Sequence, residues 1–288
     1  MPLPTDILFP VDFSDRCRSV SPAVAKMARQ LDVLVTVFHA MTFGDLKFPQ
    51  IAETLSDFLR MKLDQFPGPV ENVPAIRREL AHGPAAQSIV RMTSRMERPL
   101  IMMPTRGHTR FRQLLLGSVT AAVLHDAECP VWTEAHMEDP PEQTGDHQTL
   151  VCAVDMGPQT TGVLRAAHEF SIQFRAALLV VHSVPGVDPR FTSGIAQRAH
   201  RFLIDQALEQ FPVYRRTAGS LPGGSGLLDL PLEIVEEIGL ADGILAAAAR
   251  HNADLLIIGR GAIQGPLGRL RTIAHDLIRH SHCGVLSV

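Results

Sequence analysis

An internal repeat is the feature of this sequence that most restricts how it can fold, because a repeated segment predicts a repeated structural unit. The segment DILFPVDFSDRC at 6–17 corresponds to TLVCAVDMGPQT at 149–160, so that Asp12 and Asp155 lie 143 residues apart. A later pair of apolar segments, LVTVFHA and ALLVVHS, keeps the same spacing. The histidines of this second pair are His39 and His182. The chain therefore contains two copies of one unit in the same order.

The spacing between the copies grows toward their ends, which indicates an insertion in the second copy. Arg106 and Gly107 lie 154 residues before Arg260 and Gly261, so the second copy has gained a net 11 residues. The Gly-rich segment TAGSLPGGSGLLDL at 217–230 is the expected site of this insertion. Its composition is typical of a flexible loop.

A polar segment with two adjacent prolines separates the copies and is typical of a linker between domains. We therefore expect a first domain over 1–137, a linker over 138–148 and a second domain over 149–288. A chain of 288 residues is long enough for two domains of ordinary size.

Short apolar runs alternate with amphipathic segments in the first copy. In SPAVAKMARQL, the residues Val24, Met27, Ala28 and Leu31 recur at helical spacing. The apolar runs are continuous, as in strands that are covered on both faces. The alternation predicts an α/β fold with a parallel sheet, which binds ligands at the carboxyl ends of its strands. The expected strands lie near 6–11, 33–39, 73–79, 99–103 and 129–133, and the expected helices near 15–30, 50–65, 85–96 and 118–127.

The composition argues against several classes of protein. A net charge of −3, with one Trp and one Tyr, argues against a partner that is a nucleic acid. No stretch approaches the roughly 20 apolar residues of a membrane helix, and the N-terminal segment lacks a signal-peptide pattern. The four cysteines form no C-x-x-C pair, which fits a reducing compartment, so we expect a cytoplasmic protein. Cys17 is the cysteine that we expect to be most exposed.

The segment IMMPTRGHTRFRQLLLGSV at 101–119 places glycines and arginines between an apolar run and a helical pattern. Glycines let backbone N–H groups approach phosphate oxygens, and the N-terminus of a helix attracts anions. Gly107 and Gly117 are therefore candidates for a phosphate-binding loop, in which Ser118 would cap the following helix. Pro104 argues against this hypothesis, because proline fixes φ and removes one N–H donor.

The order of these segments resembles the tandem form of the universal stress protein family. The first copy carries ILFPVDFS and RGHTRFRQLLLGSVTAAVLHDAECPVW, where the family has Gly-x-x-Gly, nine residues, Gly-Ser, a helix and a Cys-Pro-Val strand. The second copy offers ADLLIIGRGAIQGPLGRLRTIAHDLIRHSHCGVLSV. The resemblance implies a stress-response protein with two Rossmann-like domains of the adenine nucleotide alpha hydrolase-like type. Each domain would be a five-stranded sheet between layers of helices.

Some members of this family bind ATP and others do not, and the late Gly-rich motif largely distinguishes them. By this resemblance, an adenine nucleotide with its Mg²⁺ would contact the same strand ends in both copies. In the first copy the implied residues are Asp12, Met41, Arg106, Gly107, Gly117, Ser118 and Val119. In the second copy they are Asp155, Gly259, Gly261 and Thr272, where Thr272 would cap its helix as Ser118 does.

Alternatives remain open for the aspartates and the histidines. Asp12 can lie beside the nucleoside, as the resemblance implies, and it can also cap the helix that begins at SDRC. His39 and His182 can lie near the adenine, or they can be strand-end histidines that are hydrogen-bonded to the backbone.

Two functions also remain open. Pro104, Arg271 and a loop after Gly259 that is one residue shorter than in the family support a protein-interaction scaffold without nucleotide. No base or pair of metal-binding carboxylates stands beside the late loop, so we expect slow ATP hydrolysis at most. Family members pair through their last strand. This predicts that 129–134 and 283–288 pair within the chain as a pseudo-dimer, and it leaves a homodimer of whole chains open.

Overall fold

The computed structural model describes residues 2–42, 49–66, 73–105, 116–134, 147–187, 194–260 and 270–288, with the backbone alone for 49–52 and 270–272. The chain divides into two compact units, essentially Leu3–Glu134 and Ala135–Val288, which we call the first and second domains. Within the described residues, no helix is both long enough and apolar enough to cross a membrane.

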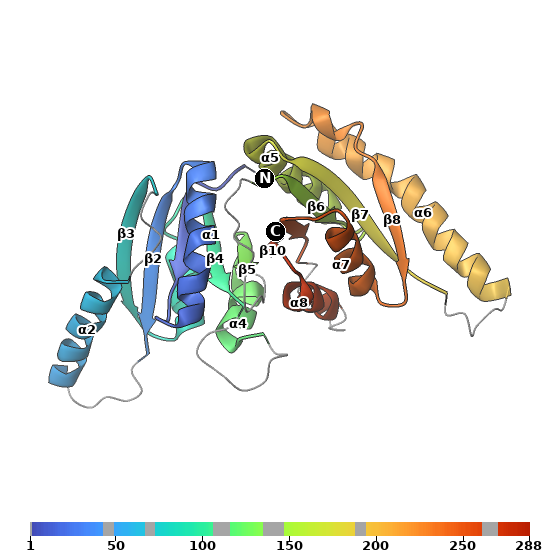
Figure 1. The fold of residues 1–288 in the computed structure, drawn as a ribbon. Helices are drawn as coiled ribbons and strands as arrows, with labels where there is room; N and C mark the ends of the chain where they lie inside the picture. Colours follow the sequence, from blue (N-terminus) through green and yellow to red (C-terminus); the bar gives the residue numbers. More distant parts are fainter. Residues whose placement is uncertain are drawn as a thin grey trace. The chain divides into compact units, whose positions relative to one another are not determined.

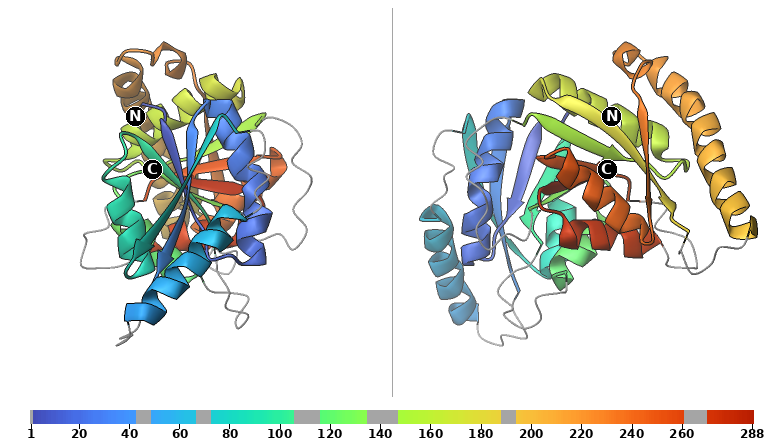
Figure 2. Two further views of the ribbon diagram at one scale, coloured as in Figure 1. Left: turned by 90° about the vertical axis from the view of Figure 1, so that its left-hand side faces the viewer. Right: turned by 45° about the vertical axis from the view of Figure 1, so that its right-hand side comes forward.

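The first domain is a parallel sheet between helices (Figure 1). Its elements are β1 (Asp6–Pro10), α1 (Asp15–Leu31), β2 (Leu34–Met41), α2 (Pro49–Asp64), β3 (Ala75–His82), α3 (Ala85–Thr93), β4 (Pro99–Pro104), α4 (Ser118–Asp126) and β5 (Val131–Glu134). The strand order is β3-β2-β1-β4-β5, and these neighbours pair in parallel. Right-handed crossovers place α1 and α2 on one face and α3 and α4 on the other. Figure 2 shows α1 and α3 on opposite faces of the sheet.

The second domain repeats this topology. Its elements are β6 (Thr149–Ala153), α5 (Thr160–Phe174), β7 (Ala177–Pro185), α6 (Gly194–Gly219), the 3₁₀ helix η1 (Ser225–Leu227), β8 (Leu232–Glu237), α7 (Leu240–Arg250), β9 (Leu255–Ile258), α8 (Leu270–His280) and β10 (Gly284–Ser287). The strand order is β8-β7-β6-β9-β10, again with parallel pairs. The predicted fold, two tandem α/β domains with parallel five-stranded sheets, is confirmed.

Helix α1 forms where the apolar spacing predicted it. Ser14 is the N-cap residue, and its side chain accepts a hydrogen bond from the Cys17 backbone N–H. Asp32 ends the helix in the left-handed conformation with φ of 54°. Between these ends, Val24 and Met27 are fully buried, so the predicted apolar face is the face that packs on the sheet.

The central strands of both sheets are buried on both faces, which explains their continuous apolar sequences. Each of six side chains in β1 and β6 has no exposed surface, namely Ile7, Leu8, Phe9, Leu150, Val151 and Cys152. Burying one large aliphatic or aromatic side chain contributes about 1.5–3 kcal/mol, so these strands anchor the two cores. Both cores lie beneath the strand ends where ligands were expected.

The insertion in the second copy is not the flexible loop that its glycines predicted. Helix α6 has 26 residues where α2 has 16, so most of the added length extends a helix. The segment after it forms the 3₁₀ helix η1, in which Leu227 is fully buried. Arg215 of α6 also donates a hydrogen bond to the Leu230 carbonyl oxygen over 2.8 Å. The glycines allow this segment to pack closely against the domain.

The end of the expected linker packs with the second domain. His147 stacks on Phe174, with the ring centroids 4.8 Å apart. The Gln148 backbone N–H donates to the Asp254 carboxylate, and the Gln148 carbonyl accepts from Ala177. Residues 147 and 148 are therefore held by the fold, whereas the earlier part of the expected linker, 138–146, lies outside the described residues.

Candidate functional site

The strand order of the first domain reverses between β1 and β4, and a cavity of about 240 Å³ lies at the carboxyl ends of these strands. Ligands of open α/β sheets bind at such a position. The lining comes from six elements and their adjoining turns. It consists of Pro10, Val11, Asp12, Cys17, Phe38, His39, Ala40, Ala85, Ile89, Met103, Pro104, Gly117, Ser118, Val119 and Thr120.

Asp12 lies at the cavity but does not cap α1. One carboxylate oxygen accepts hydrogen bonds from the Ser14 backbone N–H at 3.0 Å and from the Cys17 thiol at 3.1 Å. Ser14 supplies the cap instead. Asp12 therefore stabilises the turn before the helix while its side chain faces the cavity.

Cys17 is buried, so the expectation that it would be the most exposed cysteine was wrong. Burial and the nearby negative charge of Asp12 raise the pKa of the Cys17 thiol to about 12. The thiol is therefore neutral and acts as a hydrogen-bond donor to the carboxylate. Cys17 belongs to the candidate site as a support for Asp12, not as a nucleophile.

His39 is held by the backbone and also lines the cavity. Its Nδ1 lies 2.7 Å from the Val11 carbonyl oxygen, which can only accept, so Nδ1 carries the proton. The imidazole ring also packs on Phe13, with the ring centroids 4.4 Å apart. Burial lowers the pKa of His39 below its ordinary value. The side chain is therefore a neutral part of the cavity wall.

The start of α4 differs from the sequence-based expectation. Gly117, not Ser118, occupies the N-cap position, and Ser118 is the first helical residue. Gly117 has φ of −61°, a conformation open to any residue, and its N–H donates to the Thr105 carbonyl oxygen over 2.9 Å. Gly117, Ser118 and Val119 nevertheless all line the cavity.

Pro104 ends β4 inside the cavity wall. Its carbonyl oxygen accepts a hydrogen bond from the Thr120 hydroxyl over 3.1 Å, which ties the strand end to α4. Met41 behaves differently from its prediction, because it is buried at the end of β2 but is not part of the described cavity lining. Arg106, Gly107 and Gly261 lie outside the described residues.

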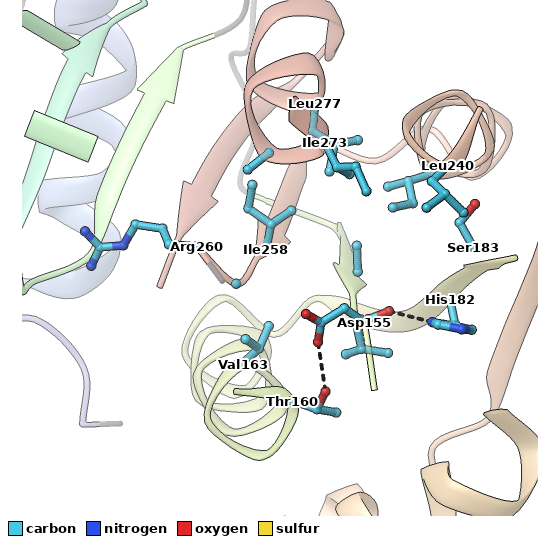
Figure 3. A pocket seen from close by; sticks show the side chains of 15 residues that line it. Asp155, Thr160, Val163, His182, Ser183, Leu240, Ile258, Arg260, Ile273 and Leu277 are labelled. Carbon is cyan, nitrogen blue, oxygen red and sulfur yellow. Dashed lines mark hydrogen bonds between the residues drawn. The ribbon is translucent and has the colours of Figure 1, made fainter. Parts of the chain in front are cut away.

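The second domain has a corresponding cavity of about 210 Å³ (Figure 3). Asp155 stands at its edge, where one carboxylate oxygen accepts from the Gly157 N–H at 2.8 Å and from the Thr160 hydroxyl at 3.3 Å. Figure 3 shows Ile273 and Leu277 on the opposite wall. The remaining lining is mostly apolar and consists of Ala153, Val154, Val163, His182, Ser183, Leu240, Ile244, Ile258, Gly259, Arg260 and Ala274.

Two polar side chains of β7 stand in this second cavity wall. His182 Nδ1 lies 2.8 Å from the Val154 carbonyl oxygen, the same bond that His39 makes in the first domain. The buried Ser183 hydroxyl has no hydrogen-bond partner among the described residues. The open question about the two histidines is thus answered in part, since both are bonded to the backbone and both line a cavity.

Strand pairing corrects the alignment of the two late loops. Ile7 pairs with Leu100, and Leu150, which corresponds to Ile7, pairs with Leu255. Each residue of β9 therefore lies 155 residues after its counterpart in β4. Gly259 thus corresponds to Pro104, and Arg260 corresponds to Thr105 instead of Arg106. The glycine that Pro104 replaces in the first copy is thus present in the second.

Gly259 lies where two other side chains approach closely. A Cβ on this residue would lie 3.0 Å from Val163 and 3.2 Å from the Gln159 side-chain oxygen. The adjacent Arg260 side chain points away from Asp155 in Figure 3. Helix α8 begins at Leu270, so Thr272 lies inside its first turn and does not occupy the N-cap position that we expected.

Sequence reasoning missed the two donors that hold the aspartates. Cys17 and Thr160 lie five residues after Asp12 and Asp155, and each donates to the aspartate of its own copy. The repeat alignment pairs these two residues directly, so their shared ability to donate a hydrogen bond was the available signal. Ile89 and Ile244, which line the two cavities from α3 and α7, carried no comparable signal.

A sequence model described as the universal stress protein family matches residues 5–133 and 147–288, which is nearly the whole chain in two copies. The chain belongs to the universal stress protein family. This universal stress protein is 27% identical over 133 residues to Universal stress protein MJ0531 of Methanocaldococcus jannaschii, a match that covers 43% of this chain and 78% of that protein.

Solved structures share the tandem fold. A universal stress protein from Archaeoglobus fulgidus is 20% identical with a TM-score of 0.63, and the match covers 98% of this chain and 95% of that one. A putative universal stress protein from Pseudomonas aeruginosa is 17% identical with a TM-score of 0.59, and the match covers 99% and 92%. At these identities the similarity shows the fold.

Proposed function

We propose that this universal stress protein binds ATP or a related adenine nucleotide in the cavity of its first domain. One observation carries the proposal. Asp12 and the first turn of α4 line the same cavity at the point where the strand order reverses. A carboxylate can accept hydrogen bonds from ribose hydroxyls, and the N-terminus of a helix attracts phosphate.

The size of the cavity determines which part of the nucleotide it would hold. At about 240 Å³ it is smaller than the roughly 300–1,000 Å³ typical of sites that enclose a whole ligand. We therefore place the base and ribose in the cavity and the phosphates outside it, at Ser118 and Val119. Arg106 and Gly107 would complete the phosphate site by sequence, and Mg²⁺ would arrive with the phosphates.

The second cavity is the weaker candidate for a nucleotide. It keeps Asp155 and has Gly259 at the strand end, but Arg271 stands in the sequence where the first copy has Gly117. Its wall is formed mainly by aliphatic side chains such as Ile258 and Ile273. The site residues Asp155, Gly259, Gly261 and Thr272 thus remain a secondary part of the proposal.

We propose binding without efficient catalysis. Asp12 already accepts from Ser14 and Cys17, and His39 is committed to the Val11 carbonyl through Nδ1. Within the described residues, no group of three His, Cys, Asp or Glu side chains is placed to hold a metal ion. A role as a stress-response sensor in the cytoplasm is part of the same proposal.

A scaffold without nucleotide is the second candidate, and one observation favours it. The Gly117 N–H, which could otherwise donate to a phosphate, is bonded to the Thr105 carbonyl oxygen. In this alternative the cavities are by-products of the fold, and protein partners determine the function. The pairing of 129–134 with 283–288 and a homodimer of chains stay predictions under both candidates.

Calorimetric titration with Mg-ATP, ADP and AMP, together with mass spectrometry of ligand released from fresh protein, tests the proposal. We expect binding to the wild-type chain that Asp12→Asn weakens about tenfold, the loss of roughly one charge-assisted hydrogen bond. Gly117→Arg should abolish binding, because the Arg side chain would occupy the phosphate position. Asp155→Asn and Thr272→Ala are the matched variants of the second domain and should leave the affinity of the first cavity unchanged.

The outcomes separate the two candidates. No released ligand and no heat at millimolar nucleotide would reject the proposal in favour of the scaffold. Binding that Asp155→Asn weakens while Asp12→Asn does not would move the site to the second domain. Circular dichroism of each variant shows whether the fold is retained.

A further inference from the structure

The second cavity has a buried serine in its wall whose hydroxyl has no partner among the described residues. Ser183 of β7 is 9% exposed and lines the cavity of about 210 Å³ (Figure 3). The corresponding residue of the first cavity is Ala40, so this hydroxyl belongs to the second copy alone. A buried hydroxyl without a hydrogen bond lowers stability, so its presence needs an explanation.

The neighbours of Ser183 in α7 offer its hydroxyl no side-chain partner. The helix approaches most closely at Gly243, where an added Cβ would lie 2.9 Å from the Ser183 Oγ. The Gly243 N–H already donates to the Gly239 carbonyl oxygen. Leu240 and Ile244 also line the cavity from α7, and their side chains are aliphatic. A molecule in the cavity is therefore the partner for which this wall leaves room.

The wall formed by α8 favours an apolar molecule. Among the described residues, α8 lines the second cavity with Ile273, Ala274 and Leu277. The corresponding helix of the first domain, α4, contributes the hydroxyl groups of Ser118 and Thr120 to its cavity. The second cavity thus has apolar side chains on the wall where the first has hydrogen-bonding groups.

The charges of the lining argue against an anionic ligand. The Asp155 carboxylate stands at the edge and would repel a phosphate or a carboxylate. Arg260 is the one Lys or Arg among the described lining residues, and its side chain points away from the others in Figure 3. Water also suits the space beside Ser183 poorly, because a buried water makes about three hydrogen bonds and the nearby side chains of α7 are aliphatic.

We propose that the second cavity binds a small neutral molecule with an aliphatic body and one hydroxyl or carbonyl oxygen, which accepts a hydrogen bond from Ser183. An apolar cavity of about 150 Å³ binds benzene, with its six non-hydrogen atoms, so about 210 Å³ corresponds to about eight. A primary alcohol with seven carbon atoms has this size. Such a molecule and a nucleoside are alternatives for the second cavity, and the proposal does not depend on nucleotide binding by the first domain.

Methyl NMR of the full chain during titration with 1-heptanol tests the proposal. We expect saturable shifts of the methyl groups of Ile244, Ile258 and Ile273, while Ile89 of the first cavity stays unchanged. A Kd on the order of 100 µM is reasonable for a ligand of this size. Heptanoate should bind at least about tenfold more weakly, because it carries a charge. No shifts at the solubility limit of 1-heptanol, saturable shifts at Ile89 alone, or equal affinity for heptanoate would overturn the proposal.

Two serine substitutions test the role of the hydroxyl. Ser183→Ala should weaken the binding of 1-heptanol about fivefold, the loss of one neutral hydrogen bond. It should not lower the Tm of the ligand-free protein, since the hydroxyl has no partner among the described residues. Ser171→Ala is the matched control, because that buried hydroxyl donates to the His168 carbonyl oxygen over 2.8 Å. The control should lower the Tm and leave the affinity for 1-heptanol unchanged.

A filled cavity and a competing ligand complete the test. Ala274→Leu adds bulk from α8 and should abolish the binding of 1-heptanol, while circular dichroism reports whether the fold is retained. Unchanged affinity in Ser183→Ala, or in a folded Ala274→Leu chain, would place the ligand elsewhere and overturn the proposal. Displacement of 1-heptanol by AMP would assign the cavity to nucleosides and overturn it as well. Nucleotide binding that depends on Asp12 is independent of these outcomes, so the two proposals can fail separately.

Discussion

The two cavities of this universal stress protein share a frame and differ in what they present to a ligand. In both, an aspartate accepts from the backbone N–H two residues later, and a histidine binds a carbonyl oxygen through Nδ1. In both, the residue after the aspartate is left-handed, with φ of 62° at Phe13 and 57° at Met156. Many cavity-facing positions differ, and three of them change the polar character or the backbone of the wall. They are Ala40 and Ser183, Pro104 and Gly259, and Thr120 and Ala274.

The comparison distinguishes two kinds of residue. Residues that hold the backbone are the same in both domains, whereas several residues that would contact a ligand differ. The bonds of Asp12 and His39 recur in the second domain with nearly unchanged lengths, as expected for parts that the fold itself requires. The cavity walls have diverged around them. A shared aspartate or histidine is therefore weak evidence that both domains bind the same molecule.

The largest expected effect tests whether the two domains are stable independently of each other. Phe9 and Cys152 occupy equivalent, fully buried positions in β1 and β6. Phe9→Ala should lower the free energy of unfolding of the first domain by about 3–5 kcal/mol, through lost burial and a cavity. Cys152→Ala should cost about 1 kcal/mol in the second domain. Urea unfolding checks this. Two transitions, one shifted by Phe9→Ala and the other by Cys152→Ala, would show independent domains, whereas a single transition shifted by both variants would mean that the domains unfold as one unit.

A smaller effect should distinguish the two strand ends at Gly259 and Pro104. Gly259→Ala places a Cβ 3.0 Å from Val163, so the second domain should lose about 1–3 kcal/mol through overpacking. Pro104→Ala keeps the carbonyl that Thr120 uses and should cost less than about 1 kcal/mol. Thermal unfolding of both variants gives the comparison. A Gly259→Ala protein as stable as the wild type would show that α5 can move away at no cost.

The smallest effect is a pH dependence of the first domain. Burial lowers the pKa of His39, so below its ordinary value of 6.5 the unfolded chain binds a proton that the folded chain resists. The free energy of unfolding should therefore fall as the pH decreases from about 6.5 toward the pKa of His39 in the folded state. Above that window, His39 should contribute no pH dependence. Urea unfolding at several pH values should show a weaker dependence for His39→Gln. An unchanged dependence would assign the titration to another group.

Much of the fold could be predicted because the internal repeat and the spacing of the apolar residues can be read directly from the sequence. The helical spacing of Val24 and Met27 predicted α1, and the continuous apolar run around Leu8 predicted a buried strand. Asp12 and Gly117 could be placed at one end of the sheet because parallel strands all end on the same side. These inferences needed no knowledge of side-chain packing.

The errors came from contacts that sequence spacing does not encode. Gly224 and Gly226 suggested a flexible loop, but they allow η1 to pack closely, with Gly226 against the ring of His168. The late loops were aligned with a spacing of 154 residues, but strand pairing shows that the spacing is still 155 residues at β9. Gly259 was therefore aligned one residue away from its structural counterpart, Pro104. Ser118 was assigned a cap that the backbone gives to Gly117.

The hydrogen bond from Gly117 to Thr105 determines which amides would report occupancy of the first cavity. The Gly117 amide hydrogen is already protected from exchange in the ligand-free protein, and a phosphate would replace one acceptor by another. The following N–H groups belong to the first turn of α4, where helices leave their donors without intrahelical partners. Slowed deuterium uptake at Ser118 and Val119, with Gly117 little changed, is thus the exchange signature of a ligand at this helix.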